Sequence, residues 1–412
     1  MTDGPSYQNP FRPGAGQKPL YLAGRTHEQE EFRTMLRQQP VSQNLVLTGL
    51  RGVGKTVLLD ELKPIALQAN WVWAGNDLSE SASLSEERIA KRIITDLAAL
   101  LGPLIELREL KPLLGFTSKD TISSRPIDFN DLWSIYEATP GLVEDKLKAT
   151  LESVGNVIGQ LSRIDGIIIA YDEAQNLSDH RSSEEFPLSM LLDTFSYLQR
   201  RQVKCKFLLI LCGLPTLLPK LNEARTYTER MFHIMRLQRL SKSAAKDAIL
   251  KPIEIARSPL KFHDALVNDI IEMSGGYPYF IQFICKEVFD AWIGRAKQGM
   301  RPVVPRQEIV AKLDEDFFAG RWQRATDRQQ EFLQIIASLD NCEEEFSVND
   351  IVIASRKLLK KGFSPSHATQ ILQALTEKGL VYKSRRGSYV LAVPLMSQFI
   401  RRQPWDGAAR RV

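Results

Sequence analysis

Short apolar runs alternate with helical stretches between about residue 20 and residue 240. Four of the five runs are almost continuously apolar, as strands are when helices cover both faces of a parallel sheet. The five strand candidates are residues 44–48, 71–74, 167–171, 207–211 and 233–237. Strands that alternate with helices are typical of the α/β class. The pattern therefore predicts a three-layer α/β domain with a parallel sheet over residues 20–240.

Two further stretches follow other patterns. Residues 1–19 are rich in Pro, Gly and polar side chains and predict an extended arm. Residues 101–160 are longer than a crossover between two strands needs, and we interpret them as an insertion. A polar stretch there, 117–126, precedes a helical periodicity of apolar side chains. Its members are Leu132, Tyr136, Leu142, Leu147 and Leu151.

The remaining sequence divides into a helical segment and a compact module. Residues 241–298 have a helical pattern throughout and predict a helical lid, and 299–321 begin with Gly and Pro and predict a connection. Residues 322–402 form the module, and 403–412 a tail. We interpret Arg401, Arg402, Arg410 and Arg411 as a solvated tail rather than as a site. A chain of 412 residues is long enough for two or three domains, which agrees with this division.

Capping residues and a hairpin organise the C-terminal module. Three helices are predicted to begin after Thr326, Ser347 and Ser364, because Ser and Thr accept hydrogen bonds from the first free N–H groups of a helix. Pro365 follows Ser364 at the first helical position, where proline is favoured. Two short strands, 380–383 and 388–392, then enclose a basic turn. The order is helix, helix, turn, helix and basic hairpin.

Positive charge is concentrated in this module. Residues 321–412 have 15 Lys and Arg against 9 Asp and Glu, whereas the whole chain has 54 against 49. The excess indicates a module suited to an anionic partner. No run of about 18 uncharged apolar residues occurs, and the N-terminus has no apolar core of a secretory signal. The four cysteines have neither disulfide nor zinc spacing, so we expect a cytoplasmic protein without a membrane span.

A glycine-rich loop follows the first predicted strand. Residues 49–56 satisfy the pattern G-x-x-x-x-G-K-S/T, and a helix is predicted at 57–63. Glycines let successive N–H groups point into one concavity, and the start of a helix favours negative charge. In this pattern Lys55 reaches the β- and γ-phosphates of ATP, and the hydroxyl group of Thr56 binds Mg²⁺. The predicted nucleotide-binding residues are Gly49, Arg51, Gly52, Val53, Gly54, Lys55, Thr56 and Val57.

Two carboxylates follow the third predicted strand. Residues 167–171 end in Asp172 and Glu173, at the edge where parallel sheets bind their ligands. We expect Asp172 to hold Mg²⁺ through its hydration shell and Glu173 to activate the attacking water. A solvated turn is the alternative for these two residues alone, but the phosphate loop favours the catalytic interpretation.

The phosphate loop and the acidic pair resemble the Walker A and Walker B motifs of the additional-strand, catalytic-glutamate ATPases. Within that class the chain is similar to the AAA+ and STAND groups, particularly to initiator-like and archaeal-type ATPases with a C-terminal winged helix. The GRxxE motif of those families, which lines the adenine pocket, is matched by Gly24, Arg25 and Glu28. Their GxP lid turn is matched by Gly276 and Pro278, and the proline there packs near the base. The resemblance covers about residues 20–295.

The sequence departs from the family at the strand that carries sensor 1. That strand ends in Cys212 and Gly213 rather than in a polar side chain, and only Thr216 nearby offers a hydroxyl group. The departure predicts slow or partner-stimulated turnover, and we identify no sensor 2 arginine in the lid. The resemblance implies an arginine finger before the last strand, with Arg230 as the first candidate and Arg225 as the second. Such a finger acts on a neighbouring subunit, so we expect a homo-oligomer or a complex with a partner protein.

The C-terminal module resembles a winged helix-turn-helix, whose third helix enters the major groove of DNA while the wing contacts phosphates. The resemblance implies double-stranded DNA as a partner. The candidates for contacts to base edges or to phosphates are Ser366, His367, Gln370, Gln373, Lys360, Lys361, Lys383, Arg385 and Arg386. Winged helices also dock proteins, and this third helix carries little charge, so that alternative stays open.

Two functions from different classes follow. The first is an ATP-driven molecular switch, an ATPase that couples its nucleotide state to DNA binding or to assembly. The alternative is a regulatory adaptor or scaffold of the defence or transposition type, which binds nucleotide with little hydrolysis and docks a protein on its winged helix.

Overall fold

The computed structural model of the chain describes residues 8–38, 41, 43–104, 126–160, 163–201, 205–296, 304–385 and 387–405. The chain forms two compact units. The sheet unit comprises Arg25–Gly49 and Lys55–Leu237. The C-terminal unit comprises Met1–Gly24, Leu50–Gly54 and Gln238–Val412. No helix among the described residues is long and apolar enough to cross a membrane.

Five parallel strands form the central sheet, in the order β2-β3-β4-β1-β5. Their bounds are β1 Asn44–Gly49, β2 Trp71–Ala74, β3 Gly166–Tyr171, β4 Lys206–Gly213 and β5 Phe232–Leu237. Each predicted strand is present, and the parallel sheet is confirmed. Strand β4 pairs with β1 on one side and with β3 on the other, so it lies between the strand that precedes the phosphate loop and the strand that ends before Asp172.

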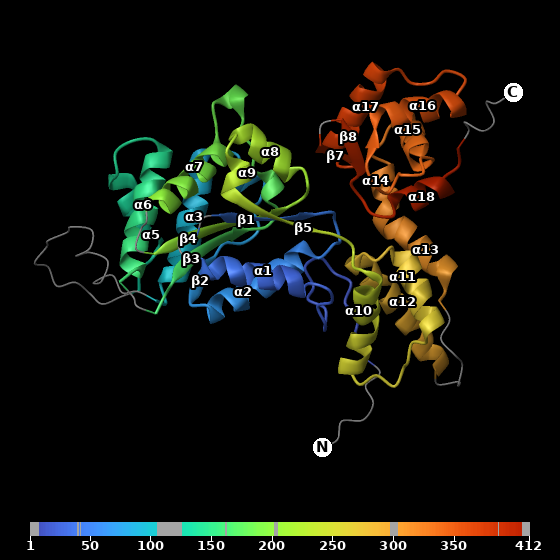
Figure 1. The fold of residues 1–412 in the computed structure, drawn as a ribbon, viewed down its shortest axis with the longest axis horizontal. Helices are drawn as coiled ribbons and strands as arrows, with labels where there is room; N and C mark the ends of the chain where they lie inside the picture. Colours follow the sequence, from blue (N-terminus) through green and yellow to red (C-terminus); the bar gives the residue numbers. More distant parts are fainter. Residues whose placement is uncertain are drawn as a thin grey trace, which may run out of the picture. The chain divides into compact units, whose positions relative to one another are not determined.

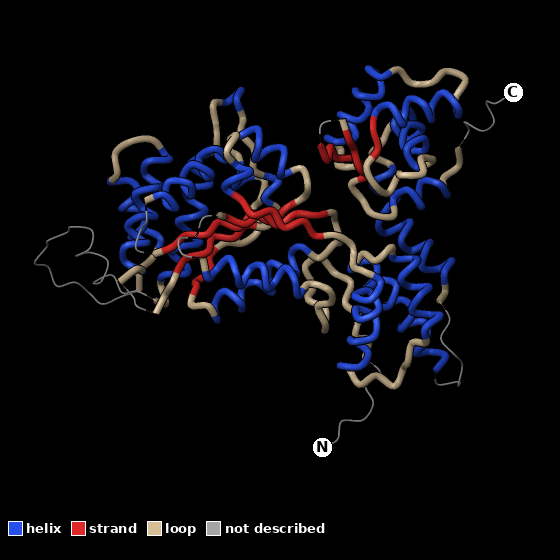
Figure 2. Tube along the Cα trace, in the orientation of Figure 1, coloured by secondary structure: helices blue, strands red, loops and turns tan. Residues whose placement is uncertain are grey.

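Helices cover both faces of this sheet, which gives the three predicted layers (Figures 1 and 2). One face carries α1 Thr26–Arg37 and α2 Lys55–Gln68. The other face carries α3 Glu86–Leu101, α5 Phe129–Ala138, α6 Val143–Ile158 and α7 Pro187–Arg200. Two shorter helices, α8 Leu217–Ala224 and α9 Thr228–Met231, precede β5. Both faces of β1 and β3 are buried, which explains their continuous apolar runs.

The predicted insertion contributes two helices to this second layer. The single periodicity expected through Leu142 is wrong, because the chain leaves the helix at Thr139 and Leu142 is 75% exposed at the start of α6. Pro140 and Gly141 separate α5 from α6, and Gly141 has a φ of +117°. The other four periodic side chains are buried in one cluster with residues of α3 and α7. Most of the polar stretch 117–126 lies outside the described residues.

Three helices of the C-terminal unit form the lid: α10 Lys242–Ile255, α11 Asp264–Ser274 and α12 Pro278–Ala296. The connection expected at 299–321 is largely helical from Arg306 onwards, and its first residues, up to 303, lie outside the described ones. It consists of α13 Arg306–Leu313, the π-helix Asp314–Ala319 and α14 Gly320–Trp322.

The C-terminal module has the order of elements of a winged helix. Its elements are α15 Asp327–Ala337, β6 Phe346–Ser347, α16 Val348–Leu358, α17 Pro365–Glu377, β7 Val381–Arg385, β8 Ser388–Leu391 and α18 Met396–Arg402. The strands pair in the order β6-β8-β7. Thr326, Ser347 and Ser364 cap their helices as predicted. Strand β6 was not predicted, because two residues are too few to form a recognisable pattern.

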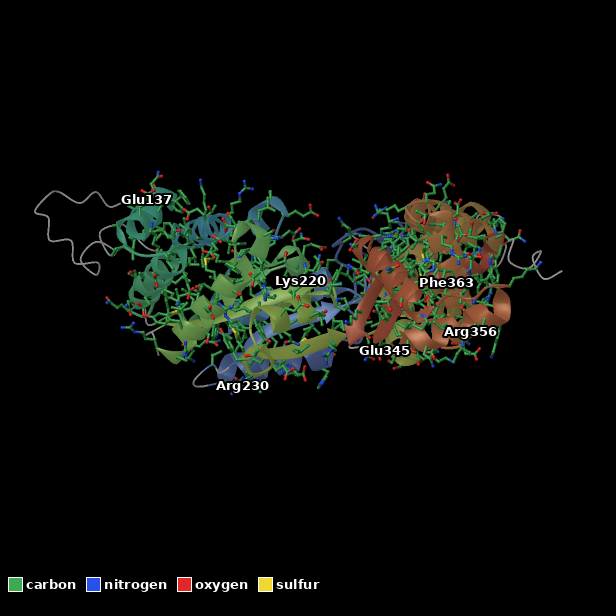
Figure 3. The ribbon with its side chains drawn as sticks, turned by 90° about the horizontal axis from the view of Figure 1, so that it is seen from above. Glu137, Lys220, Arg230, Glu345, Arg356 and Phe363 are labelled. Carbon is green, nitrogen blue, oxygen red and sulfur yellow. The ribbon has the colours of Figure 1, made fainter. Side chains whose placement is uncertain are left out.

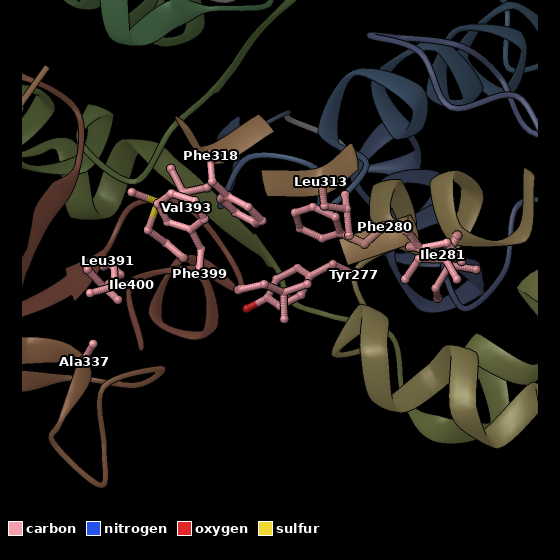
Figure 4. Close-up of a cluster of buried hydrophobic side chains, with 14 of the residues drawn as sticks. Tyr277, Phe280, Ile281, Leu313, Phe318, Ala337, Leu391, Val393, Phe399 and Ile400 are labelled. Carbon is pink, nitrogen blue, oxygen red and sulfur yellow. The ribbon is translucent and has the colours of Figure 1, made fainter. Parts of the chain in front are cut away.

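The lid and the winged module share one hydrophobic core (Figure 4). Phe318 of the π-helix stacks on Phe399 of α18, with 5.4 Å between the ring centroids, and on Phe280 of α12 at 6.1 Å. Arg401 and Arg402 are exposed, as expected, but they do not lie in a tail. Both belong to α18, where Arg401 donates to the carbonyl oxygen of Ala337 at 2.8 Å and Arg402 forms an ion pair with a carboxylate of the π-helix.

The N-terminal arm is extended, as expected, but it is anchored to the lid. Phe11 is 3% exposed and stacks near Phe262, with 6.2 Å between the centroids. Asn9 donates to the carbonyl oxygen of Lys286 at 3.0 Å and to the Asp290 carboxylate at 2.7 Å. Apolar burial and these hydrogen bonds hold the described part of the arm in place.

Candidate functional site

The phosphate loop has the backbone that its glycines permit. Gly52 and Gly54 have φ values of +74° and +92°, a region that residues with a Cβ atom avoid. Helix α2 begins at Lys55, so the loop ends at a helix N-terminus, where free N–H groups favour an anion. The Nζ atom of Lys55 donates to the carbonyl oxygen of Gly49 at 3.0 Å. This bond holds the lysine side chain at the end of β1.

The lid turn lies against the phosphate loop within the C-terminal unit. The backbone N–H of Tyr279 donates to the carbonyl oxygen of Gly52 at 3.1 Å. A Cβ atom on Gly52 would lie 3.0 Å from Cβ of Tyr279, and one on Gly54 would lie 4.0 Å from Cγ of Pro278. The GxP turn predicted from Gly276 and Pro278 therefore packs on the loop. Tyr279 was not predicted, because a tyrosine after a proline carries no sequence signal.

Asp172 is the centre of a buried hydrogen-bond network at the carboxyl edge of the sheet. It is 4% exposed, its Oδ2 accepts from the Thr56 hydroxyl at 2.6 Å, and its Oδ1 accepts from the backbone N–H of Glu173 at 2.7 Å. Burial, together with this carboxylate and a hydrogen bond to it, raises the pKa of the Cys212 thiol well above its usual value. The Cys212 thiol is therefore protonated at neutral pH.

This edge of the sheet fits a magnesium ion shared with a nucleotide. Burial and the nearby Asp172 and Asp77 carboxylates raise the pKa of Asp60, and a divalent cation would relieve that repulsion. Among the described residues no group of three or more His, Cys, Asp or Glu side chains could hold a metal alone. Thr56 and Asp172 supply the hydroxyl and carboxylate oxygens that Mg²⁺ uses beside waters and phosphates.

Glu173 follows Asp172 in a left-handed conformation, with a φ of +53°. Its carboxylate accepts a hydrogen bond from the side-chain amide of Gln175, in the 3₁₀-turn Ala174–Asn176. The Gln175 amide oxygen in turn accepts from the backbone N–H of Leu214, just beyond β4, at 2.9 Å. Gln175 was not predicted. The only signal for it is indirect, namely the glycine at the end of β4.

The GRxxE residues are divided between the two units. Gly24 has a φ of +63°, and a Cβ atom on it would lie 2.6 Å from Cβ of Ala244 in α10. Arg25 precedes α1, is 5% exposed and forms an ion pair of 3.1 Å with Glu28. Burial lowers the pKa of Arg25, and the pair with Glu28 acts in the opposite direction. Arg25 and Glu28 thus fix the start of α1.

The two arginine-finger candidates have different surroundings. Arg225 donates to both carboxylate oxygens of Asp193, with Nε distances of 3.0 and 3.1 Å, and to the Ser189 hydroxyl at 2.7 Å. Arg230 is exposed on α9 at the rim of the sheet unit, and it forms no ion pair with the residues that the structure describes (Figure 3). With Tyr227 it lines a pocket of about 540 Å³.

Most of the predicted DNA-contacting side chains are exposed on one helix, its preceding turn or the wing. The exposed ones are Lys360, Lys361, Ser366, His367, Gln370, Gln373 and Lys383. The side chain of Arg385 and all of Arg386 lie outside the described residues. Phe363, two residues before α17, packs edge-on against Phe332, with 5.1 Å between the ring centroids. The Arg328 guanidinium lies over the Phe363 ring, 4.1 Å from its centroid.

Two family models match parts of the chain. Residues 21–206 match the AAA ATPase domain family, and residues 315–400 match a domain of unknown function, DUF8462. None of the curated proteins matches the chain. The Aeropyrum pernix ORC2 protein in its ADP form is 12% identical, with a TM-score of 0.50 over 96% of this chain and 97% of that one.

Two other similar structures are the Aeropyrum pernix ORC1 protein in complex with DNA and Cdc6p from Pyrobaculum aerophilum. The first is 14% identical, with a TM-score of 0.43 and 96% of each chain covered. The second is 14% identical, with a TM-score of 0.44 over 93% of this chain and 96% of that one. The likeness to ORC2 shows a shared fold, the P-loop ATPase fold with a lid and a C-terminal module.

Proposed function

We propose that this chain, whose residues 21–206 match the AAA ATPase domain family, is an ATP-hydrolysing molecular switch. The winged helix couples the nucleotide state to DNA binding or to assembly. The observation that carries the proposal is the contact of Thr56 with Asp172, next to Glu173, because it joins the two Walker motifs at one edge of the sheet.

ATP and Mg²⁺ supply a polarised terminal phosphate and charge neutralisation. In the proposal the N–H groups of residues 49–57 and the start of α2 bind the phosphates, and Lys55 turns from the Gly49 carbonyl oxygen toward them. Thr56 and Asp172 hold the metal, directly and through its waters. Gly24 and Arg25 border the base together with Pro278, as the family resemblance implies.

Glu173 is the catalytic base of the proposal. Its carboxylate takes a proton from the attacking water while the bond to the terminal phosphate breaks. Water activation needs an oriented carboxylate oxygen, and the hydrogen bond from Gln175 supports such an orientation.

Arg230 is the proposed arginine finger for the nucleotide of a neighbouring subunit. Its exposure supports this role, whereas Arg225 is occupied by Asp193. Hydrolysis then depends on assembly of a homo-oligomer or on a partner protein. The four cysteines are buried and free of disulfides, which supports a cytoplasmic location.

Double-stranded DNA is the proposed partner of the winged helix. The exposed polar positions Ser366, His367 and Gln370 on α17 suit base edges, and the lysines before the helix and on the wing suit phosphates. Binding through phosphates falls steeply with rising salt, so the affinity should be measured at several salt concentrations.

Nucleotide binding and hydrolysis are tested separately. Lys55→Ala should abolish ATP binding measured by calorimetry, and Glu173→Gln should keep binding while removing hydrolysis. DNA-stimulated turnover of the wild-type chain would support the switch. Unchanged ATP binding in Lys55→Ala would overturn the nucleotide site itself.

A regulatory adaptor is the second candidate. The end of β4 favours it, since Cys212 and Gly213 replace the polar side chain that senses the γ-phosphate in the resembling families. Tight ATP binding without turnover, with or without DNA, together with binding of a protein to the winged helix, would select the adaptor over the switch.

A further inference from the structure

Gln175 connects the acidic pair to the end of the neighbouring strand. Its side-chain nitrogen donates to Oε2 of Glu173, and its side-chain oxygen accepts from the backbone N–H of Leu214 at 2.9 Å. A backbone N–H can only donate, so it must face the oxygen of the Gln175 amide. The nitrogen is thereby directed to Glu173. The position therefore requires both a hydrogen-bond donor and an acceptor, which the side-chain amide of glutamine supplies.

Gly213 makes room for this amide. A Cβ atom on Gly213 would lie 2.6 Å from Oε1 of Gln175 and 3.1 Å from its backbone nitrogen. Gly213 does not have a positive φ, so its backbone would accept alanine and the limit is space alone. Gly213 ends β4 in register with Thr48 of β1. The Gln175 amide thus fills the place beside the strand end where a side chain would otherwise lie.

The turn that carries Gln175 is held from two other elements. Nζ of Lys220 in α8 donates to the carbonyl oxygen of Gln175 at 2.5 Å and to that of Leu177 at 3.4 Å. Burial lowers the pKa of Lys220. Asn176 donates to the carbonyl oxygen of Leu78 at 2.8 Å. These bonds hold the backbone of the turn on both sides of Gln175. The position of the Gln175 side-chain amide is therefore well defined.

We propose that Gln175 is a positioning residue that orients the Glu173 carboxylate from the end of β4. The inference rests on the proposed hydrolytic role of Glu173. The amide occupies one carboxylate oxygen as a donor and leaves the other to accept a proton from water. Gly213 and Gln175 act together. Gly213 has no side chain, and the amide of Gln175, from the turn after β3, takes the place that a side chain at the end of β4 would fill.

Gln175→Glu tests the donor with little change of shape. The variant keeps an acceptor for Leu214 but places two carboxylates together, so we expect turnover to fall by about 100-fold, as misplaced catalytic groups do. The Kd for ATP should stay within about two-fold of the wild-type value, because no phosphate-binding residue changes. Gln398→Glu, at an exposed position of α18, is the matched control for the added charge.

Gly213→Ala, at the end of the neighbouring strand β4, tests the same contact by placing a Cβ atom against the Gln175 amide. It should lower turnover with little effect on ATP binding. The exchange variant Glu173→Gln with Gln175→Glu restores a donor and an acceptor, so its Tm should recover relative to Gln175→Glu while turnover stays absent. Wild-type turnover in Gln175→Glu, with none in Glu173→Gln, would overturn the positioning role and leave the ATPase intact. Absent wild-type turnover would instead overturn the proposed function, and the Tm cycle would still report the contact.

Discussion

The hydroxyl group of Thr56 donates a hydrogen bond of 2.6 Å to Oδ2 of Asp172, a residue 116 positions later in the chain. Asp172 is almost fully buried, and a buried carboxylate requires donors. The Thr56 hydroxyl and the Glu173 backbone N–H provide them. The network therefore preorganises the acidic edge of the sheet.

Thr56→Ala should weaken magnesium-dependent ATP binding by about 10- to 100-fold, because it removes an oxygen from the proposed metal site and a partner of Asp172. Binding should be measured by calorimetry with Mg²⁺ and again with a chelator, and the loss should appear only with Mg²⁺. Thr56→Ser retains the hydroxyl group and should bind as the wild type does. Equal losses in both conditions would argue against a metal role for Thr56.

Asp193→Asn should lower the free energy of unfolding at pH 7 by about 1 to 2 kcal/mol, since the pair with Arg225 is partly solvated. Burial alone would raise the pKa of Asp193, but hydrogen bonds from Arg225 and Tyr227 outweigh it and lower the pKa. The stabilisation is then present above the unfolded pKa of about 3.9 and is lost as the pH falls below it. Denaturation at pH 7 and pH 3 should show the difference between the proteins shrinking in acid. A constant difference would contradict this origin.

Gly52→Ala should weaken ATP binding by at least about 10-fold. A left-handed conformation costs a residue with a Cβ atom about 1–2 kcal/mol, and this Cβ would also press on Tyr279. Gly320→Ala is a matched control, because Gly320 is helical and a Cβ atom there meets nothing within 4 Å. It should leave ATP binding unchanged and raise the Tm slightly. Normal ATP affinity in Gly52→Ala would show that the loop conformation is not required.

Phe11→Ala should destabilise the C-terminal unit by about 3–5 kcal/mol, as removal of a buried aromatic side chain does. The side chain is 3% exposed between the arm and the lid, whereas Leu20 is 38% exposed. Leu20→Ala, from the same segment, should cost far less in urea denaturation. A negligible effect of Phe11→Ala would mean that the arm does not dock in solution.

A thiol reagent should modify none of the four cysteines of the folded chain rapidly at pH 8. All four are buried, and burial raises the pKa of each thiol, to about 12 for Cys205. Only the thiolate reacts, so labelling should follow unfolding. Absorbance measurements with and without denaturant check this, and fast labelling of the native chain would contradict it.

Much of the fold could be predicted because its signals are local. The five strands are short apolar runs between helices, and Thr326, Ser347 and Ser364 mark helix starts by their own side chains. The break between α5 and α6 was not predicted, because the apolar spacing continues through Leu142 although Pro140 and Gly141 end the first helix. The docking of Phe11 on the lid was not predicted, because a single aromatic residue in a polar segment does not indicate which residues it packs against.

The sequence by itself determined the phosphate loop, the acidic pair and the order of the elements, since these depend on residue type and spacing along the chain. Only the tertiary structure decided which distant groups meet. In the fold Arg225 donates hydrogen bonds to Asp193, whereas Arg230 stays exposed. The sequence alone does not distinguish these two arginines. The fold also brought Gln175 over Gly213, because parallel pairing of β3 with β4 places their carboxyl ends together.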